Sequence, residues 1–192
     1  MANKVKYGLK NVHYAVATIA NNGSASYGTP KEIYGAVNLS MDPQGDVTKF
    51  RADNMDYWVG QANNGYEGDL EIALVPDSFK KDVLGYLEDT NGILIENADA
   101  PSVHFALLFE FDGDANKTRH VLYNCTSGRS AVSGATTEET IEPQTETLAL
   151  TASAVYNATI DKNVVKADCP STITAKYNAW FTSVFQAAAL TT

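Results

Sequence analysis

The chain has 192 residues, of which 44% are hydrophobic and 19% are charged, so it can build a core and is not a disordered protein. Its formal net charge of −9 argues against a domain that grips nucleic acid by its phosphates. No apolar run approaches the roughly 20 residues of a membrane helix, and the first twenty residues lack the features of a signal peptide. We therefore expect a protein made in the cytoplasm, without a membrane partner.

Charge is unevenly distributed along the chain. Residues 1–32 read as an arm followed by a first strand, and four lysines precede the first acid of the chain. Residues 130–161 hold no Lys or Arg, and a long polar loop is expected at 127–144. Two interpretations stay open: both segments are solvated, or the arm of one subunit meets the acidic segment of another. The charged residues concerned are Lys4, Lys6, Lys10, Glu138, Glu139 and Glu142.

The middle of the chain reads as strands over 33–41 and 47–53, followed by a polar loop at 60–68. In "DLEIALV", residues 69–75, leucine and isoleucine alternate with acids, so one face meets a core and the other meets water or a neighbour. Pro76 ends this strand, and Asp77 is a suitable N-cap. A helix of about three turns, Ser78 to Thr90, should follow and dock on the sheet.

The clearest signal is a hairpin. Residues 102–112, "SVHFALLFEFD", and 118–126, "TRHVLYNCT", both alternate and are joined by a polar turn. The first strand places its phenylalanines on one strongly apolar face and Glu110 on the other. A further strand is expected over 145–155, with Leu148 and Leu150 facing inward. The last segment reads either as a strand or as a helix followed by a strand.

No motif points to catalysis or to a cofactor. Asp112, Asp114 and Asn116 begin like a calcium loop, but Lys117 stands where that loop needs glycine. The three histidines lack zinc-site spacing, and Cys125 lies in a strand pattern typical of a core residue. We therefore expect no enzyme, no metal and no cofactor.

Three segments carry a resemblance to a known family. They are "GYEGDLEIALVPDSFKKDVLGY", "HFALLFEFDGDANKTRHVLYNCT" and "TTEETIEPQTETLAL", in that order. Together they resemble the major tail protein, or tail tube protein, of long-tailed, non-contractile bacteriophages of Gram-positive bacteria. The resemblance runs from about residue 34 to residue 150.

The resemblance implies a mainly β fold: one tail tube domain over residues 1–192, a β-sandwich or half-barrel with one flanking helix. It also implies that six subunits form a ring, and that rings stack into the tube through which double-stranded DNA leaves the virion without specific binding. The other partners that it implies are the tape-measure protein, the tail terminator and the distal tail protein.

Two sets of residues follow as assembly candidates. Glu71 and Glu110 lie on the less apolar strand faces and are expected to point into a negatively charged channel, which would repel DNA. The charged residues of the arm and of the 127–144 loop, Lys4, Lys6, Lys10, Glu138, Glu139 and Glu142, are expected to bridge adjacent rings.

Two alternatives remain at this point. The chain could be a free-standing β-sandwich that binds carbohydrate, for which Tyr57 with Trp58, or Trp180 with Phe181, would have to form an exposed aromatic platform. It could also be another structural component of a phage, in the capsid or the baseplate.

Overall fold

The computed structural model describes residues 5–136 and 143–190, in which the chain forms fifteen strands and two short helices. The prediction of a mainly β protein is confirmed. None of the helices described is long and apolar enough to cross a membrane. The strands are β1 (Leu9–Ile19), β2 (Ala25–Tyr27), β3 (Lys31–Glu32), β4 (Ala36–Pro43), β5 (Val47–Ala52), β6 (Met55–Gln61), β7 (Tyr66–Ile72), β8 (Leu87–Glu88), β9 (Leu94–Ile95), β10 (His104–Phe111), β11 (Arg119–Ser127), β12 (Glu146–Ala152), β13 (Val155–Asn157), β14 (Lys162–Val164) and β15 (Lys166–Cys169), and the helices are α1 (Asp77–Asp82) and α2 (Thr174–Ala179).

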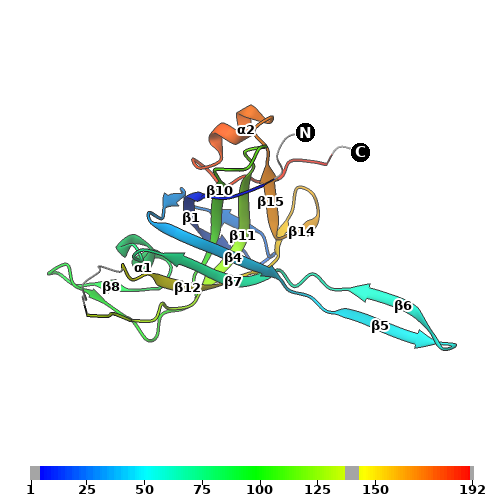
Figure 1. Cartoon of the computed structure of the whole chain (residues 1–192), viewed down its shortest axis with the longest axis horizontal. Coiled ribbons are helices and arrows are strands. Elements are labelled where there is room, and N and C mark those ends of the chain that lie inside the picture. Colours follow the sequence, from blue (N-terminus) through cyan, green and yellow to red (C-terminus); the bar gives the residue numbers. More distant parts are fainter. Residues whose placement is uncertain (1–4, 137–142, 191–192) are drawn as a thin grey trace.

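One nine-stranded antiparallel sheet organises the subunit (Figure 1). Its strand order is β2-β1-β10-β11-β12-β7-β4, with β3 added to β1 and β15 added to β11. The sheet curls, so that β4 comes close to β1 without a strand ladder closing the gap. The expected hairpin over residues 102–126 is present as β10 and β11.

The concave side of the curled sheet encloses the main core. Phe105 and Leu107 of β10 face Leu70 of β7 and Leu148 of β12, and helix α1 adds Phe79. All five side chains are essentially inaccessible to solvent. The inward alternation is confirmed for Leu70 and Ile72 and for Leu148 and Leu150. It was wrong for Leu74, which is 65% exposed because β7 ends at Ile72.

A second core covers the opposite face of β10 and β11, where Ala106 and Leu108 pack under the C-terminal segment. Trp180, directly after α2, is 2% exposed and donates from Nε1 to the carbonyl of His120 at 3.2 Å. The expectation that only one face of this hairpin is strongly apolar was therefore wrong. The C-terminal segment, ambiguous in the sequence, forms the short helix α2 that closes this second core.

The predicted three-turn helix is also corrected. Helix α1 spans only Asp77–Asp82, its N-cap position is Pro76, and no side chain caps it. Gly85 has φ of +71°, and a Cβ there would lie 2.4 Å from Ala100, so the chain leaves the helical path at this point. The following residues form the β8–β9 hairpin, in which Leu87 is 57% exposed instead of extending the helical stripe.

Candidate assembly surfaces

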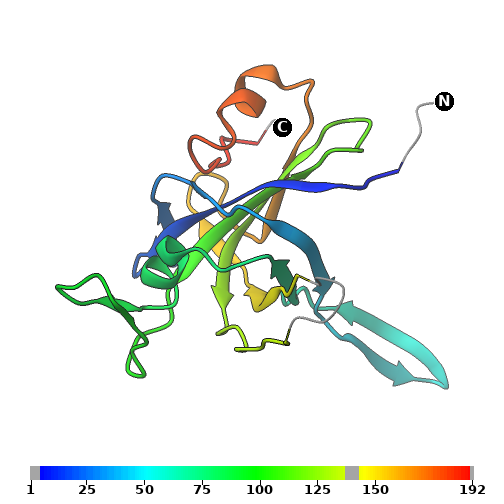
Figure 2. The ribbon, with the colours of Figure 1, turned by 60° about the vertical axis from the view of Figure 1, so that its left-hand side comes forward.

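The most prominent surface feature is the hairpin of β5 and β6, which stands away from the body of the subunit (Figures 1 and 2). Its strands pair only with each other. The two-residue turn Asp53–Asn54 has positive φ at both positions, as in the tight turns that match the twist of a hairpin. A lone two-stranded hairpin is marginally stable in water, so this arm needs something to pack against.

The hairpin is unusually apolar for an exposed element. Six large hydrophobic side chains on it are more than half exposed: Val47, Phe50, Met55, Tyr57, Trp58 and Val59. Phe50 and Trp58 form a cross-strand pair. A Cβ at Gly60 would lie 2.2 Å from the Trp58 indole, so glycine is what allows the ring to lie over the strand. Exposed apolar surface of this extent marks an interaction site.

Charged groups on the hairpin are paired with one another. Asp56 accepts from the Lys49 ammonium at 3.0 Å and lies 3.4 Å from Nε of Arg51. All three are solvent-exposed, so these pairs stabilise the hairpin little. They keep a strand edge soluble, which natural proteins do with charged side chains.

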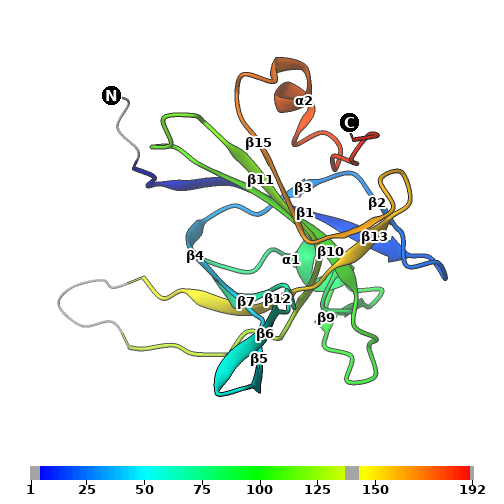
Figure 3. The ribbon, with the colours of Figure 1, turned by 90° about the vertical axis from the view of Figure 1, so that its right-hand side faces the viewer.

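A second surface is the outer face of β4, β7 and β12, which lie side by side (Figure 3). Glu67, Asp69 and Glu71 occupy alternate positions of the central strand β7 and form one row of carboxylates on this face. Small or polar residues flank the row on both sides, at positions 38, 40, 42, 147, 149 and 151. The face is therefore acidic and free of bulky apolar groups.

Glu71 lies at the end of this row and is half-buried. Its Oε1 accepts a hydrogen bond of 2.6 Å from the Thr145 hydroxyl. The structure thus places this predicted channel residue on a continuous acidic face with two further acids.

Glu110 has a different environment, because its side chain is only 8% exposed. Arg119, its register partner on β11, donates to it at 2.7 Å, and Asn11 donates at 2.6 Å. Arg119 also stacks on Tyr177 and donates to its carbonyl. Glu110 therefore anchors a buried ion pair under the C-terminal segment, and the free subunit does not present it on a surface.

The arm residues that the structure describes contact their own subunit. The Lys6 ammonium lies 4.9 Å from the centre of the Phe111 ring, and Lys10 pairs with Asp112. Hydrogen bonding to Lys10 is the main cause that holds the pKa of Asp112 below its ordinary value. The other predicted inter-ring residues, Lys4, Glu138, Glu139 and Glu142, lie outside the described residues.

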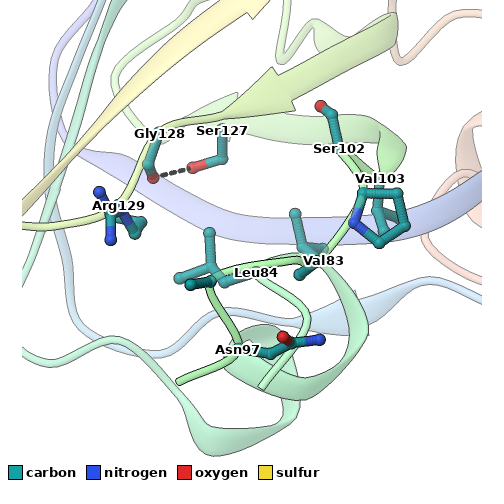
Figure 4. Close-up of a pocket in the computed structure, with 11 residues that line it drawn as sticks. Val83, Leu84, Asn97, Ser102, Val103, Ser127, Gly128 and Arg129 are labelled. Atoms are coloured by element: carbon teal, nitrogen blue, oxygen red, sulfur yellow. Dashed lines mark hydrogen bonds between the residues drawn. The ribbon is translucent and has the colours of Figure 1, made fainter. Parts of the chain in front are cut away.

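A hollow of about 450 Å³ opens beside helix α1 (Figure 4). Val83, Leu84 and Val103 supply apolar lining, while Ser102, Ser127 and Arg129 supply polar groups. The Arg129 guanidinium is 75% exposed and donates to Glu96 at 2.7 Å. The hollow therefore combines an apolar floor with an accessible cation at its rim.

The cysteine, histidine and aspartate residues that were tested for catalysis or metal binding have contacts typical of structural residues. Burial raises the pKa of the Cys125 thiol to about 12, far from that of a nucleophile. His104 contacts Asn124 and His120 contacts Asp168, so the two histidines do not form a pair. The described residues contain no group of three or more potential metal ligands. Asp114 accepts from the backbone N–H groups of Asn116 and Thr118, which fixes the turn.

Comparison with protein families decides the classification. The family model described as phage tail tube protein matches residues 2–189. The chain belongs to the phage tail tube protein family. No curated protein matches the chain. It is thus a structural protein of a phage tail and a component of the virion, which assembles with other phage proteins.

Sequence reasoning missed the β5–β6 hairpin as an assembly surface of this tail tube protein. It predicted a strand at 47–53 and a polar loop at 60–68, and it considered Tyr57 and Trp58 only as an aromatic platform, without predicting strand β6 over these residues. The signal was present in the apolar run "YWV" of residues 57–59 and in the Asp53–Asn54 turn dipeptide.

Proposed function

We propose that the chain, as a single tail tube domain, assembles into hexameric rings that stack into the tube conducting double-stranded DNA during ejection. The observation that carries this proposal is the projecting β5–β6 hairpin with its six exposed apolar side chains. Exposed apolar surface of this kind is typical of an interaction site, and a contact between copies would bury it. Membership of the tail tube family makes a second copy of the chain the natural partner.

The acidic face of β4, β7 and β12 is our candidate for the channel wall. Glu67, Asp69 and Glu71 would repel the phosphates of DNA over the length of β7. Small flanking side chains would leave the wall smooth, so that DNA slides without adhering. Glu110 is not part of this proposal, because Arg119 neutralises it inside the subunit.

Contacts between rings are assigned first to the β5–β6 hairpin. The N-terminal arm with Lys4, Lys6 and Lys10, and the 127–144 loop with Glu138, Glu139 and Glu142, remain proposed secondary contacts. Deletion of residues 2–6 tests the arm. The deletion stops there because the carbonyls of Tyr7 and Gly8 accept backbone hydrogen bonds from Gly113 and Asp112 of their own subunit. Tape-measure protein, tail terminator and distal tail protein are the further proposed partners, and a Gram-positive bacterium is the proposed host.

Electron microscopy of the purified full chain at rising concentration tests the proposal. Hollow tubes of uniform diameter, built from rings with sixfold symmetry, are the expected result. Rings of another symmetry would refute the hexamer, and a chain that stays monomeric at every concentration would refute self-assembly through the hairpin.

A carbohydrate-binding module is the second candidate, because Tyr57 and Trp58 are 70% and 55% exposed. Trp180 is buried and is not available for such a platform. Glycan binding by a stable monomer would favour this reading over the tube.

A further inference from the structure

The β5–β6 hairpin projects at one end of the long axis of the subunit, and helix α1, beside which the hollow opens, lies toward the other end (Figure 1). A projection at one end and a recess at the other form a heterologous pair of surfaces, which generates open stacks when it repeats. Six residues of strand β5, at about 3.3 Å each, carry the turn roughly 20 Å along the hairpin. The turn is thus presented well away from its own subunit.

We propose that the turn of the hairpin, residues 51–55, inserts into the hollow beside α1 of a second copy of the chain. This inference rests on the proposed function, because it names the site at which one copy receives the arm of the next.

The apolar parts of the two surfaces match. Met55, next to the turn, is 60% exposed, and its unbranched thioether side chain adapts to irregular cavities. The hollow offers Val83, Leu84 and Val103 as a floor, and its volume of about 450 Å³ accommodates a side chain with part of a turn.

The charges match as well. The turn presents Arg51 and Asp53, both exposed, while the rim of the hollow presents Arg129 beside Glu96. Within one subunit Arg51 lies 3.4 Å from Asp56 and Arg129 donates to Glu96. Insertion would exchange these exposed pairs for Asp53 with Arg129 and Arg51 with Glu96, so each charge again meets the opposite sign. Such complementarity fixes the register of a contact more than it adds affinity.

The apolar surface continues beyond the hollow, which gives the strands of the hairpin something to pack on. Leu87, Ile93 and Ile95 of the β8–β9 hairpin are at least half exposed, and β9 leads directly into the residues that line the hollow. Phe50 and Trp58 would cover them. A specific interface needs about 1,000 Å² in total, which the turn alone does not supply.

Cysteine cross-linking of assembled tubes tests the inference. The variant Ala52→Cys with Ser102→Cys places one thiol beside the turn and one in the hollow, and leaves the charges of the turn unchanged. Mild oxidation should give a ladder of covalent multimers on a non-reducing gel, because each chain can form one disulfide through its turn thiol and another through its hollow thiol. The native cysteines are buried and add no background. Ala52→Cys with Ser26→Cys, an exposed serine on β2, is the matched control and should stay monomeric on the gel.

A charge exchange provides the second measurement. Asp53→Arg or Arg129→Asp alone should reduce tube formation at least tenfold, and the double variant should recover most of it. Tubes that form normally but give no ladder above the control, or single charge variants without effect, would overturn this docking site and leave the proposed function intact. Absence of tubes from the unmodified chain would instead refute the proposed function, and the docking site with it.

Discussion

We expect that truncation of Trp58 to alanine weakens assembly but leaves the stability of the subunit nearly unchanged. The indole is 55% exposed in the subunit, and within it Trp58 pairs across the hairpin only with Phe50. Such a cross-strand pair contributes at most about 1 kcal/mol, and the hairpin lies outside both cores. We therefore expect the Trp58→Ala variant to unfold at nearly the same denaturant concentration as the unmodified chain.

The effect on assembly should be much larger. A tryptophan side chain buries up to roughly 250 Å², so covering its exposed half removes roughly 140 Å² from water. At about 25 cal/mol per Å² this amounts to about 3.5 kcal/mol for each contact, or about three hundredfold in the association constant. Light scattering against protein concentration measures the shift in the onset of tube formation.

Tyr34→Ala is the matched control, since Tyr34 is a 72% exposed aromatic residue that is not on the hairpin. It should assemble like the unmodified chain. A Trp58→Ala variant that assembles at the unmodified concentration, with an unchanged unfolding midpoint, would refute the role of the hairpin.

Three further predictions follow from the described contacts. Replacing Asp69 and Glu71 with Lys should leave tubes intact but slow DNA ejection, measured by dye uptake into released DNA; unchanged kinetics would remove this face from the channel. Arg119→Ala should lower the free energy of unfolding by about 3 kcal/mol, because Glu110 is left buried without its cation; a urea titration showing under 1 kcal/mol would contradict this. Backbone donors hold the pKa of Asp114 below 3.8, so its stabilisation exists above pH 3.8 and is lost as the pH falls through the folded-state pKa. Asp114→Asn should therefore lower the melting temperature at pH 7, and the difference should shrink as the pH falls below the ordinary pKa of Asp.

Strands with one buried face were predictable from the sequence. Leu70 and Ile72, like Leu148 and Leu150, recur every second residue, and this period sets which face of a strand meets the core. All four are buried. The acidic row on β7 follows from the same alternation, so Glu71 was correctly placed on the face opposite the core.

Features that depend on distant partners were not predictable in this way. Glu110 alternates like a surface residue, yet it is buried and pairs with Arg119. Arg119 is in turn held by Tyr177, which comes from a segment almost 70 residues further along the chain. Helix α1 ends early, and Gly85 with positive φ follows it. A glycine just beyond a helix end is a local stop signal, but the predicted helix ran past it to Thr90. Only the cross-strand position of Arg119 opposite Glu110 could be predicted from the sequence, because the two strands flank a short turn.

The exposed position of the apolar residues of β5 and β6 was not predictable from the sequence for a different reason. Strand prediction assumes that apolar positions face the core of the same chain. Tyr57, Trp58 and Val59 are consecutive, show no alternation and face no core of their own subunit. Their arrangement becomes intelligible only when a second copy is considered.

The two enclosed thiols have a consequence for the life of the particle. Cys125 is fully buried, and burial also raises the pKa of Cys169. Thiol–disulfide exchange requires an accessible thiolate, so neither cysteine responds when a virion passes from the reducing interior of a cell into air-equilibrated surroundings. The folded subunit thus offers neither thiol a route to a disulfide in either redox environment.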